Sequence, residues 1–257
     1  MAFYEILNPV FNPLLQPVLD KSPFLALVIL AVIISLLITL VYKFFTNQEK
    51  MKDMKGQQKD FQKKMKELRS NPEEMMKVQK EAMKLNMEYM KSSFKPTLIT
   101  MIPILLIFGW TSGHLGFEPL LPGVTYSMTA EFDESIQEAE LVVSEEIKIV
   151  SDKMQEVELG KATWKFKTKI KGEHLITIKT EEDEQSKKIL VTTNQEFIEP
   201  ISLFENSDIQ KITVNHNKLM PLKNAGIPWA SSWGWLGWYI LLSLIFSMGL
   251  RKLLKIY

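Results

Sequence analysis

The stretch PFLALVILAVIISLLITLVY, residues 23–42, contains no charged residue. A helix of twenty residues is about 30 Å long, which matches the thickness of the hydrocarbon core of a bilayer. Two further uncharged runs follow, PTLITMIPILLIFGW at 96–110 and WGWLGWYILLSLIFSMGL at 233–250. The run at 96–110 is short for a span, and a re-entrant or buried segment is the alternative. Because its two flanks differ in charge, we expect an α-helical membrane protein with transmembrane helices at 23–42, 96–110 and 229–250.

Charge is distributed unevenly around these spans. Residues 43–95 carry fourteen Lys and Arg against eight Asp and Glu, whereas residues 111–228 carry thirteen Lys against twenty acidic residues. The positive-inside rule then places 43–95 and the tail 251–257 in the cytoplasm, and 1–22 and 111–228 outside. Long domains carry little weight in that rule, but the basic residues directly after the first and third spans agree with it. The prediction is a multi-pass protein of the plasma membrane with its N-terminus outside and its C-terminus in the cytoplasm.

Residues 43–95 are predicted to form a cytosolic helical hairpin. In the first helix, steps of three and four residues indicate a coiled-coil seam of Met51, Met54, Gln58, Phe61, Met65 and Leu68. At SNPEE, residues 70–74, Asn71 suits a helix N-cap, Pro72 the first helical position and Glu74 a capping box. The second helix has one apolar stripe, made of Met76, Met83, Met87, Met90 and Phe94.

Two other regions have their own patterns. Between 120 and 225, the runs TYSMTAEF, ELVVSEEIKIV, KATWKFKTKI, HLITIKT and KKILVTTNQEF alternate apolar and polar residues, as antiparallel strands do. They predict about seven strands in an extracytoplasmic β-sandwich inserted between spans two and three. Near the N-terminus, residues 1–20 have helical spacing at Phe3, Ile6, Leu7, Val10, Leu14 and Leu15, interrupted by Pro9, Pro13 and Pro17. This predicts short interfacial pieces on the outer membrane surface, with an extended lead-in as the alternative.

The sequence has no enzymatic signature. It contains no cysteine, which excludes disulfides and thiol chemistry. His114, His174 and His216 lie in unrelated contexts, and no zinc-protease, nucleophile-elbow or phosphate-loop motif is present. The acidic residues of 111–228 are expected to form a solvated face. We therefore expect a non-enzymatic protein without a metal or cofactor, and with no affinity for DNA.

Hydroxyl side chains inside the spans fall on the cytoplasmic side of each. With the orientation above, a hydrophilic groove open to the cytoplasm is predicted, lined by Ser35, Thr39, Thr97, Thr100, Ser243 and Ser247, with Lys43 at its inner end. Each pair is spaced by three or four residues and so shares one helix face. The alternative is that these hydroxyls bond carbonyls of their own helix or pack between helices.

Methionine is concentrated in the hairpin, where eight of the fourteen lie. Its flexible, polarizable side chain adapts to apolar partners of many shapes, whereas Leu or Ile would specify a seam better. We therefore predict a surface that holds varied hydrophobic segments, formed by Met51, Met54, Met65, Met75, Met76, Met83, Met87 and Met90. A plain coiled-coil seam is the alternative.

The chain resembles the YidC/Oxa/Get superfamily of membrane insertases in its three spans, its outside N-terminus and its Met-rich hairpin. The hairpin is the most specific of these features, in the stretch KFFTNQEKMKDMKGQQKDFQKKMKELRSNPEEMMKVQKEAMKLNMEYMKSSFKPTLITMIPILLIFGW. The chain is similar to its archaeal members, formerly labelled DUF106, whose eukaryotic relatives include a core subunit of the ER membrane protein complex. The resemblance covers about 1–122 and 229–257 and leaves the β-rich insert at 123–225 unexplained. It implies insertion without ATP through a hydrophilic groove that holds a positive charge. No Arg lies mid-span here, and Lys43 is the nearest candidate.

The predicted function is that of an insertase, which receives nascent or released membrane-protein segments on the methionines and passes them through the groove into the lipid. The basic hairpin also makes ribosomal RNA a candidate partner through attraction to phosphate, although a solvated helix surface is the commoner meaning of such charge. The competing hypothesis is a membrane-anchored β-sandwich that binds an extracellular ligand, with the hairpin as an oligomerising stalk.

Overall fold

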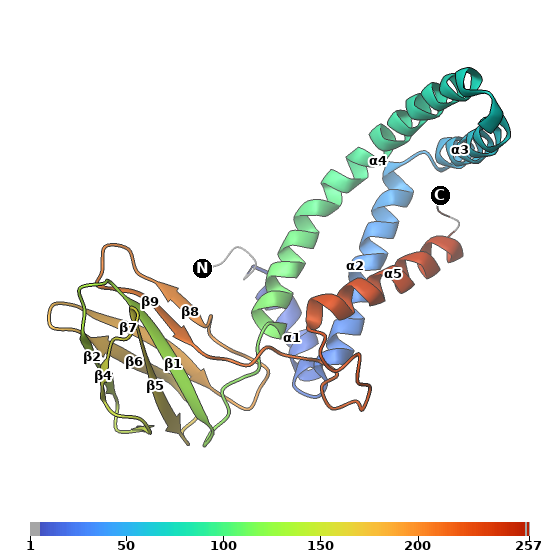
Figure 1. Cartoon of the computed structure of the whole chain (residues 1–257). Helices are drawn as coiled ribbons and strands as arrows, with labels where there is room; N and C mark the ends of the chain where they lie inside the picture. Colours follow the sequence, from blue (N-terminus) through green and yellow to red (C-terminus); the bar gives the residue numbers. More distant parts are fainter. Residues whose placement is uncertain (1–5, 255, 257) are drawn as a thin grey trace. The chain divides into compact units, whose positions relative to one another are not determined.

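The computed structural model describes residues 6–254 and 256, and Figure 1 shows its elements. The helices are α1 (Asn8–Leu19), α2 (Pro23–Phe45), α3 (Gln48–Glu67), α4 (Pro72–Leu115) and α5 (Trp235–Leu253), with a 3-10 turn at Leu68–Ser70. Among the described residues, α2, α4 and α5 are long and apolar enough to cross a membrane. The chain divides into two units, one formed by Leu25–Gly109 with Leu236 to the C-terminus and the N-terminal residues, the other by Asn8–Phe24 with Trp110–Trp235.

In the first unit, α3 and the first half of α4 are consecutive helices joined by the turn at Leu68–Ser70 (Figure 1), and a hydrogen bond from Gln58 to Asn86 connects them. Asn47 caps α3 by accepting a hydrogen bond from the backbone N–H of Lys50 at 3.0 Å. Asn71 caps α4 in the same way, through the N–H of Glu74 at 3.4 Å, which confirms the helix start expected there. The turn between these helices is therefore determined locally, by residues whose side chains replace missing backbone partners.

The span expected at 96–110 lies inside a longer helix. Helix α4 is continuous for 44 residues and passes through Pro96 and Pro103. Proline removes a backbone donor, but in an apolar setting neighbouring hydroxyls and helices satisfy the freed groups. Because the helix continues to Leu115, its part from Pro96 onward has twenty residues and spans about 30 Å, the full thickness of a bilayer core.

The N-terminal segment also differs from the expectation of broken pieces. One helix, α1, runs through Pro13 and Pro17. In the second unit it packs against the end of α4, where the rings of Phe11 and Trp110 meet edge to face with centroids 5.2 Å apart. The indole N–H of Trp110 also donates to the side-chain oxygen of Asn12 at 3.1 Å. These tertiary contacts stabilise a helix that its prolines disfavour. Phe3 lies outside the described residues.

The rest of the second unit is a β-sandwich, as predicted, but with nine strands. They are β1 (Thr125–Phe132), β2 (Glu138–Val143), β3 (Ile147–Ile149), β4 (Met154–Glu156), β5 (Lys161–Thr168), β6 (Gly172–Lys179), β7 (Glu184–Val191), β8 (Ile201–Leu203) and β9 (Ile209–Val214). One sheet has the order β3-β5-β1-β9-β8 and the other β4-β2-β6-β7. All paired strands are antiparallel.

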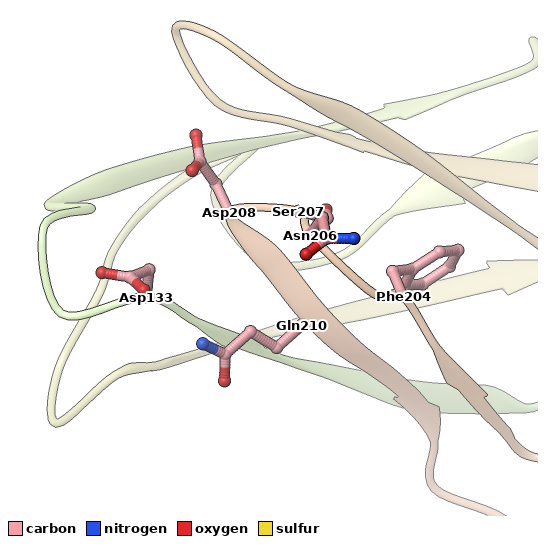
Figure 2. Close-up of a pocket in the computed structure, with 6 residues that line it drawn as sticks. All are labelled: Asp133, Phe204, Asn206, Ser207, Asp208 and Gln210. Atoms are coloured by element: carbon pink, nitrogen blue, oxygen red, sulfur yellow. The ribbon is translucent and has the colours of Figure 1, made fainter.

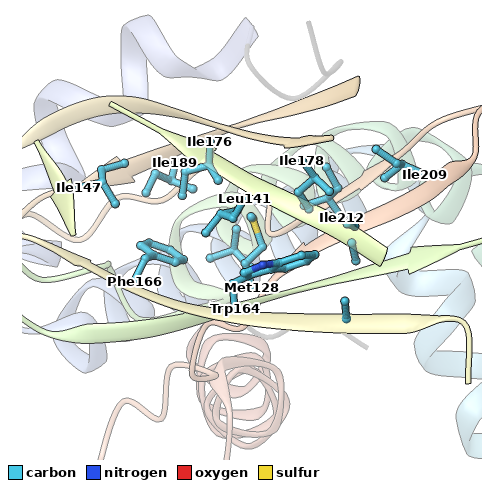
Figure 3. Close-up of a cluster of buried hydrophobic side chains, with 14 of the residues drawn as sticks. Met128, Leu141, Ile147, Trp164, Phe166, Ile176, Ile178, Ile189, Ile209 and Ile212 are labelled. Atoms are coloured by element: carbon cyan, nitrogen blue, oxygen red, sulfur yellow. The ribbon is translucent and has the colours of Figure 1, made fainter. Parts of the chain in front are cut away.

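Strict alternation explains the core between the sheets. In β5, Ala162, Trp164, Phe166 and Thr168 point inward, and the three lysines and Thr163 point outward. Figure 3 shows Trp164 and Phe166 packed among aliphatic side chains of both sheets, Met128 and Leu141 among them. The indole N–H of Trp164 donates to the carbonyl of Lys153 at 3.0 Å, so the buried ring leaves no polar group unsatisfied.

Two of the alternating runs are not single strands along their whole length. ELVVSEEIKIV contains two strands, because the chain turns at 144–146, and β2 and β3 belong to different sheets. KKILVTTNQEF was expected to continue to 197, but β7 ends at Val191. There the buried amide of Gln195 donates to the carbonyls of His114 and Phe117 at 3.2 and 2.8 Å, and the N–H of Gln195 donates to Asp20 at 2.8 Å. These bonds hold the segment after β7 against the helix ends, away from the sheet.

Candidate functional site

The two arms of the hairpin face each other through one seam. In α3, the predicted seam residues are the buried or half-buried ones, namely Met51, Met54, Gln58, Phe61, Met65 and Leu68. In α4, the half-buried positions are Met75, Val78, Ala82, Leu85 and Tyr89, which also follow steps of three and four residues. The amide of Gln58 donates to Asn86 at 2.7 Å and joins the two arms. Four of the eight methionines named as a capture surface, Met51, Met54, Met65 and Met75, therefore belong to the seam.

The other four methionines lie outside the seam. Met76, Met83, Met87 and Met90, followed by Phe94, are between 51% and 63% exposed. They are separated by steps of seven, four, three and four residues, so they share one face of α4. Coiled-coil packing of the hairpin leaves this face uncovered. An exposed row of five large apolar side chains on an otherwise charged helix is a candidate binding surface.

The same face continues into the apolar half of α4. Leu98, Met101 and Leu105 follow Phe94 at steps of four, three and four residues and are 46%, 49% and 62% exposed. We call Met76, Met83, Met87, Met90, Phe94, Leu98, Met101 and Leu105 the apolar track. Because α4 is one unbroken helix, the track runs for about 44 Å, from the charged hairpin to the apolar segment.

A row of exposed lysines lies beside the hairpin part of the track. It consists of Lys77, Lys80, Lys84 and Lys91. Steps of three, four and seven residues keep these side chains on one helix face, next to the methionines. Farther along, the ammonium group of Lys95 lies over the ring of Phe45, 5.9 Å from its centroid. The hairpin thus presents apolar and positive surface together.

The hydroxyl residues named for the groove have different surroundings. Ser35, Thr39 and Thr100 are buried, Ser243 and Ser247 are half-buried, and Thr97 and Lys43 are exposed. Several hydroxyls bond carbonyls of their own helix: Thr39 to Ser35 at 2.6 Å, Thr97 to Ser93 at 2.8 Å, Thr100 to Pro96 at 3.1 Å and Ser243 to Ile240 at 3.0 Å. These bonds are the ones expected if the hydroxyls bond their own helix and do not line a groove. The hydroxyl oxygen of Ser35 differs, since it is buried and has no hydrogen-bond partner among the described residues.

Tyr42 links the three long helices and was missed as a site residue. Its phenolic oxygen, on α2, lies 2.8 Å from the hydroxyl oxygen of Thr97 on α4. Because the single proton of Thr97 is directed at Ser93, the phenol is the donor. The guanidinium carbon of Arg251, on α5, lies 5.3 Å from the centroid of the same ring. The three helices therefore meet at one aromatic side chain.

Arg251 supplies a positive charge that sequence reasoning did not assign to the groove. Its Nε is buried and makes no hydrogen bond within the described part of the chain. A guanidinium stacked on an aromatic ring keeps its donors available for a carboxylate or phosphate. The available signal was an arginine at the end of a span, but no sequence pattern pairs it with Tyr42, 209 residues earlier.

The β domain contributes a cavity and the histidines His174 and His216. Across the described residues, no three His, Asp or Glu side chains converge as a metal site would require. Figure 2 shows a cavity of about 500 Å³ lined by Asp133, Phe204, Asn206, Ser207, Asp208 and Gln210. The histidines lie apart: the ring Nε2 of His174 donates to the carbonyl oxygen of Ile170, and the ring Nδ1 of His216 donates to that of Glu118. Burial lowers the pKa of His216.

The fold and these sites define a class, a multi-pass integral membrane protein with a β domain between its second and third apolar helices. A family model described as "Integral membrane protein EMC3/TMCO1-like" matches residues 8–157. The chain belongs to this insertase-related family, which is related to the YidC/Oxa/Get group. No curated protein and no solved structure matches the chain.

Proposed function

We propose that this protein is a membrane protein insertase that captures hydrophobic segments on the hairpin and delivers them to the bilayer along α4. The observation that carries the proposal is the apolar track, which lies outside the hairpin seam and is continuous with the apolar half of the same helix. Membership of an insertase-related family supports it.

Capture uses Met76, Met83, Met87, Met90 and Phe94. These side chains are already held on a rigid helix, so a client pays mainly for its own ordering. Covering half-exposed side chains of this size contributes on the order of 1 kcal/mol each. Such modest, shape-tolerant contacts suit a surface that must also release its client.

Transfer follows the track toward Leu98, Met101 and Leu105. A client that moves along one face of a continuous helix always has apolar contacts available, so no step leaves it fully exposed to water. Transfer is driven only by partitioning of apolar side chains from water into lipid. Each Leu, Ile, Phe or Val that enters the bilayer contributes about 0.3–0.6 kcal/mol to the free energy of insertion.

The groove residues act at the end of this path. In the closed arrangement described here, the bond between Tyr42 and Thr97 holds α2 against α4, and Ser35, Thr39 and Thr100 are buried. Separation of Tyr42 from Thr97 opens that interior, where the hydroxyls hydrate the polar flank of the client. Arg251, rather than Lys43, then supplies the positive charge of the groove, because its Nε is buried without a hydrogen-bond partner in the described part of the chain, whereas Lys43 is exposed.

The proposed orientation of the protein in the membrane is the one that the distribution of lysine and arginine predicts. The hairpin (43–95) and the tail face the cytoplasm, and the N-terminal segment and the β domain (111–228) lie outside the plasma membrane. The clients are nascent or released membrane-protein segments. The lysine row beside the track also offers phosphate-binding chemistry to a ribosome that presents a nascent chain.

Site-specific photocrosslinking tests the proposal. A photoreactive residue is placed on the track at Met83, Met90 or Leu105, and matched controls are placed on the exposed polar face of α4 at Glu81 and Glu88. During insertion of a single-span client into liposomes, crosslinks at Met83 should form first and decline as those at Leu105 rise, whereas the controls should stay weak. Equal labelling of both faces, without order in time, would refute the track.

The same experiment separates the competing function. If the hairpin were an oligomerising stalk for an extracellular binding protein, Met83 and Met90 would crosslink to a second copy of the chain and not to clients.

A further inference from the structure

Positive charge is concentrated on one face of the β-sandwich. The segment 111–228 has twenty acidic residues and only thirteen lysines. On the outer face of the five-stranded sheet the balance is reversed, because β3, β5 and β9 place Lys148, Lys161, Lys165, Lys167 and Lys211 there, and β1 supplies the acid Glu131. Glu131 pairs with Lys161 at 3.3 Å and Lys211 at 3.0 Å, so those two lysines are compensated.

The remaining lysines of this face, together with Lys169 directly after β5, form an uncompensated cluster. We define the basic patch as Lys148, Lys165, Lys167 and Lys169, none of which forms an ion pair with any residue that the structure describes. Lys148 and Lys167 are direct partners across β3 and β5. Like charges opposite each other destabilise a sheet, yet neither of these two lysines is paired with an acidic side chain among the described residues. The arrangement indicates a ligand with negative charge.

The surroundings of the patch indicate what kind of anion it meets. Val150 and Ile170 are each 47% exposed, and Val124 is 43% exposed. The N–H of Val150 donates to the carbonyl of Lys165, and the N–H of Gly123 to that of Thr168, so these apolar residues border the patch. Lysines mixed with exposed aliphatic side chains match a lipid headgroup region, where both find partners.

The patch also lies at the end of the sandwich that connects to the apolar helices. The chain leaves α4 at Leu115 and enters β1 at Thr125, which pairs with Lys167. At the same end, the N–H of Asn215 donates to Ser127 as the chain leaves β9 for α5. That connection carries the exposed Trp229 and Trp233, whose rings meet with centroids 5.7 Å apart, and tryptophan favours the membrane interface.

We propose that the basic patch binds the phosphate groups of anionic lipids in the membrane that the chain itself spans, and so docks the β domain on the bilayer surface. The proposal does not depend on insertase activity or on which side of the membrane the domain occupies. A soluble polyanion or an anionic protein is the competing ligand class, which the test separates.

The test uses the full chain in nanodiscs. Because the sequence has no cysteine, Val150→Cys carries a single fluorophore beside the patch, and Leu159→Cys carries it in the turn before β5, at the far end of that strand. A nitroxide on the lipid headgroup quenches whichever fluorophore lies at the membrane surface. In discs with phosphatidylglycerol, the label at 150 should be quenched and the label at 159 should not. In discs of phosphatidylcholine alone, quenching at 150 should fall.

Charge removal is the matched comparison. Lys148→Gln, Lys165→Gln and Lys167→Gln together should lower the ratio of docked to free domain on the order of a hundredfold, at about fivefold for each lysine near an anionic surface. The control variant replaces three lysines that lie outside the patch and that each form an ion pair with a glutamate. These substitutions, Lys153→Gln, Lys179→Gln and Lys188→Gln, should leave quenching at 150 unchanged.

Equal quenching in both lipids, or no effect of the three patch substitutions on quenching, would overturn the proposal. So would binding of soluble heparin that depends on the patch lysines, if the fluorophore at 150 is not quenched by the labelled lipid. If the patch variant fails to fold, as judged from its near-ultraviolet circular dichroism, the unsubstituted patch is tested with salt. High ionic strength should then abolish quenching at 150, and persistence of quenching would exclude electrostatic docking.

Discussion

The phenol of Tyr42 donates a hydrogen bond to the hydroxyl oxygen of Thr97 across 2.8 Å, and this bond joins α2 to α4 while Arg251 of α5 covers the same ring. One side chain thus connects three apolar helices, and it meets α4 at Thr97, between Phe94 and Leu98 of the apolar track. The contact has the properties of a latch: it is polar, it connects elements far apart in the sequence, and its loss would expose the buried hydroxyls of Ser35 and Thr39.

The first prediction concerns this latch. Tyr42→Phe removes the hydrogen bond but keeps the ring under Arg251. In a Ser35→Cys background, we expect the cysteine to react about fivefold faster with a water-soluble thiol reagent, because a hydrogen bond contributes about 1 kcal/mol. Thr97→Val should give the same increase, and the double variant no further one. Independent, additive effects would show that the two residues do not act as a pair.

The second prediction tests the exposed methionines. Changing Met76, Met83, Met87 and Met90 to Ser should slow insertion of single-span clients, measured as protease protection in liposomes. The helix should persist, because Ser costs only a few tenths of a kcal/mol of helix propensity per site. Changing the same four residues to Leu should slow insertion less but narrow the range of clients. The control changes the seam residues Met51 and Met54 to Leu, which should leave insertion intact. Normal insertion by the four-Ser variant would contradict the capture role.

The third prediction concerns orientation. In intact cells, a membrane-impermeant thiol reagent should label Leu159→Cys, in the β domain, and should not label Gln57→Cys, on the exposed side of α3. Both should be labelled after lysis, which controls for reactivity. The reverse pattern would place the hairpin outside and overturn the direction of insertion proposed here.

The fourth prediction links the β domain to pH. Asp183 accepts hydrogen bonds from the hydroxyl of Ser207, from the N–H of Asp208 at 3.1 Å and from Gln185 at 3.3 Å. The Ser207 bond is the largest cause of a lowered pKa at Asp183. Since the folded pKa lies below the unfolded value of about 3.9, the stabilisation is complete above that value and is lost as pH falls through the folded pKa.

We therefore expect the β domain to lose thermal stability below about pH 4. Circular dichroism of the full chain in detergent measures this loss. Other carboxylates contribute to any acid transition, so the comparison is with Asp183→Asn. That variant should be less stable near neutral pH by about 1 kcal/mol, and its deficit should shrink as the pH falls. A deficit independent of pH would exclude the charge of Asp183 as the cause.

Much of this protein follows from local pattern. The uncharged runs, the helical spacing of the hairpin and the alternation of TYSMTAEF and KATWKFKTKI each predict an element that the structure contains. These signals are strong because burial of one face requires a matching period of apolar residues. The helix start at Asn71 is local as well, since a cap involves residues three positions apart.

What failed depended on contacts between distant residues. Met75 and Met76 are adjacent and chemically the same, yet one is in the seam and the other is on the track, because only the position of α3 distinguishes the two faces of α4. Likewise, the sequence was divided between a hairpin ending at 95 and a span beginning at 96, whereas α4 runs through both as one helix.

The sequence by itself determined that the chain has three apolar helices, a methionine-rich hairpin and an all-β segment, since hydrophobicity and period belong to the residues themselves. Only the tertiary structure decided which methionines stay exposed, that Tyr42 meets both Thr97 and Arg251, and that Lys148 faces Lys167 across two strands. The physical reason is that exposure, pairing and register are properties of two surfaces, and a local pattern describes only one of them.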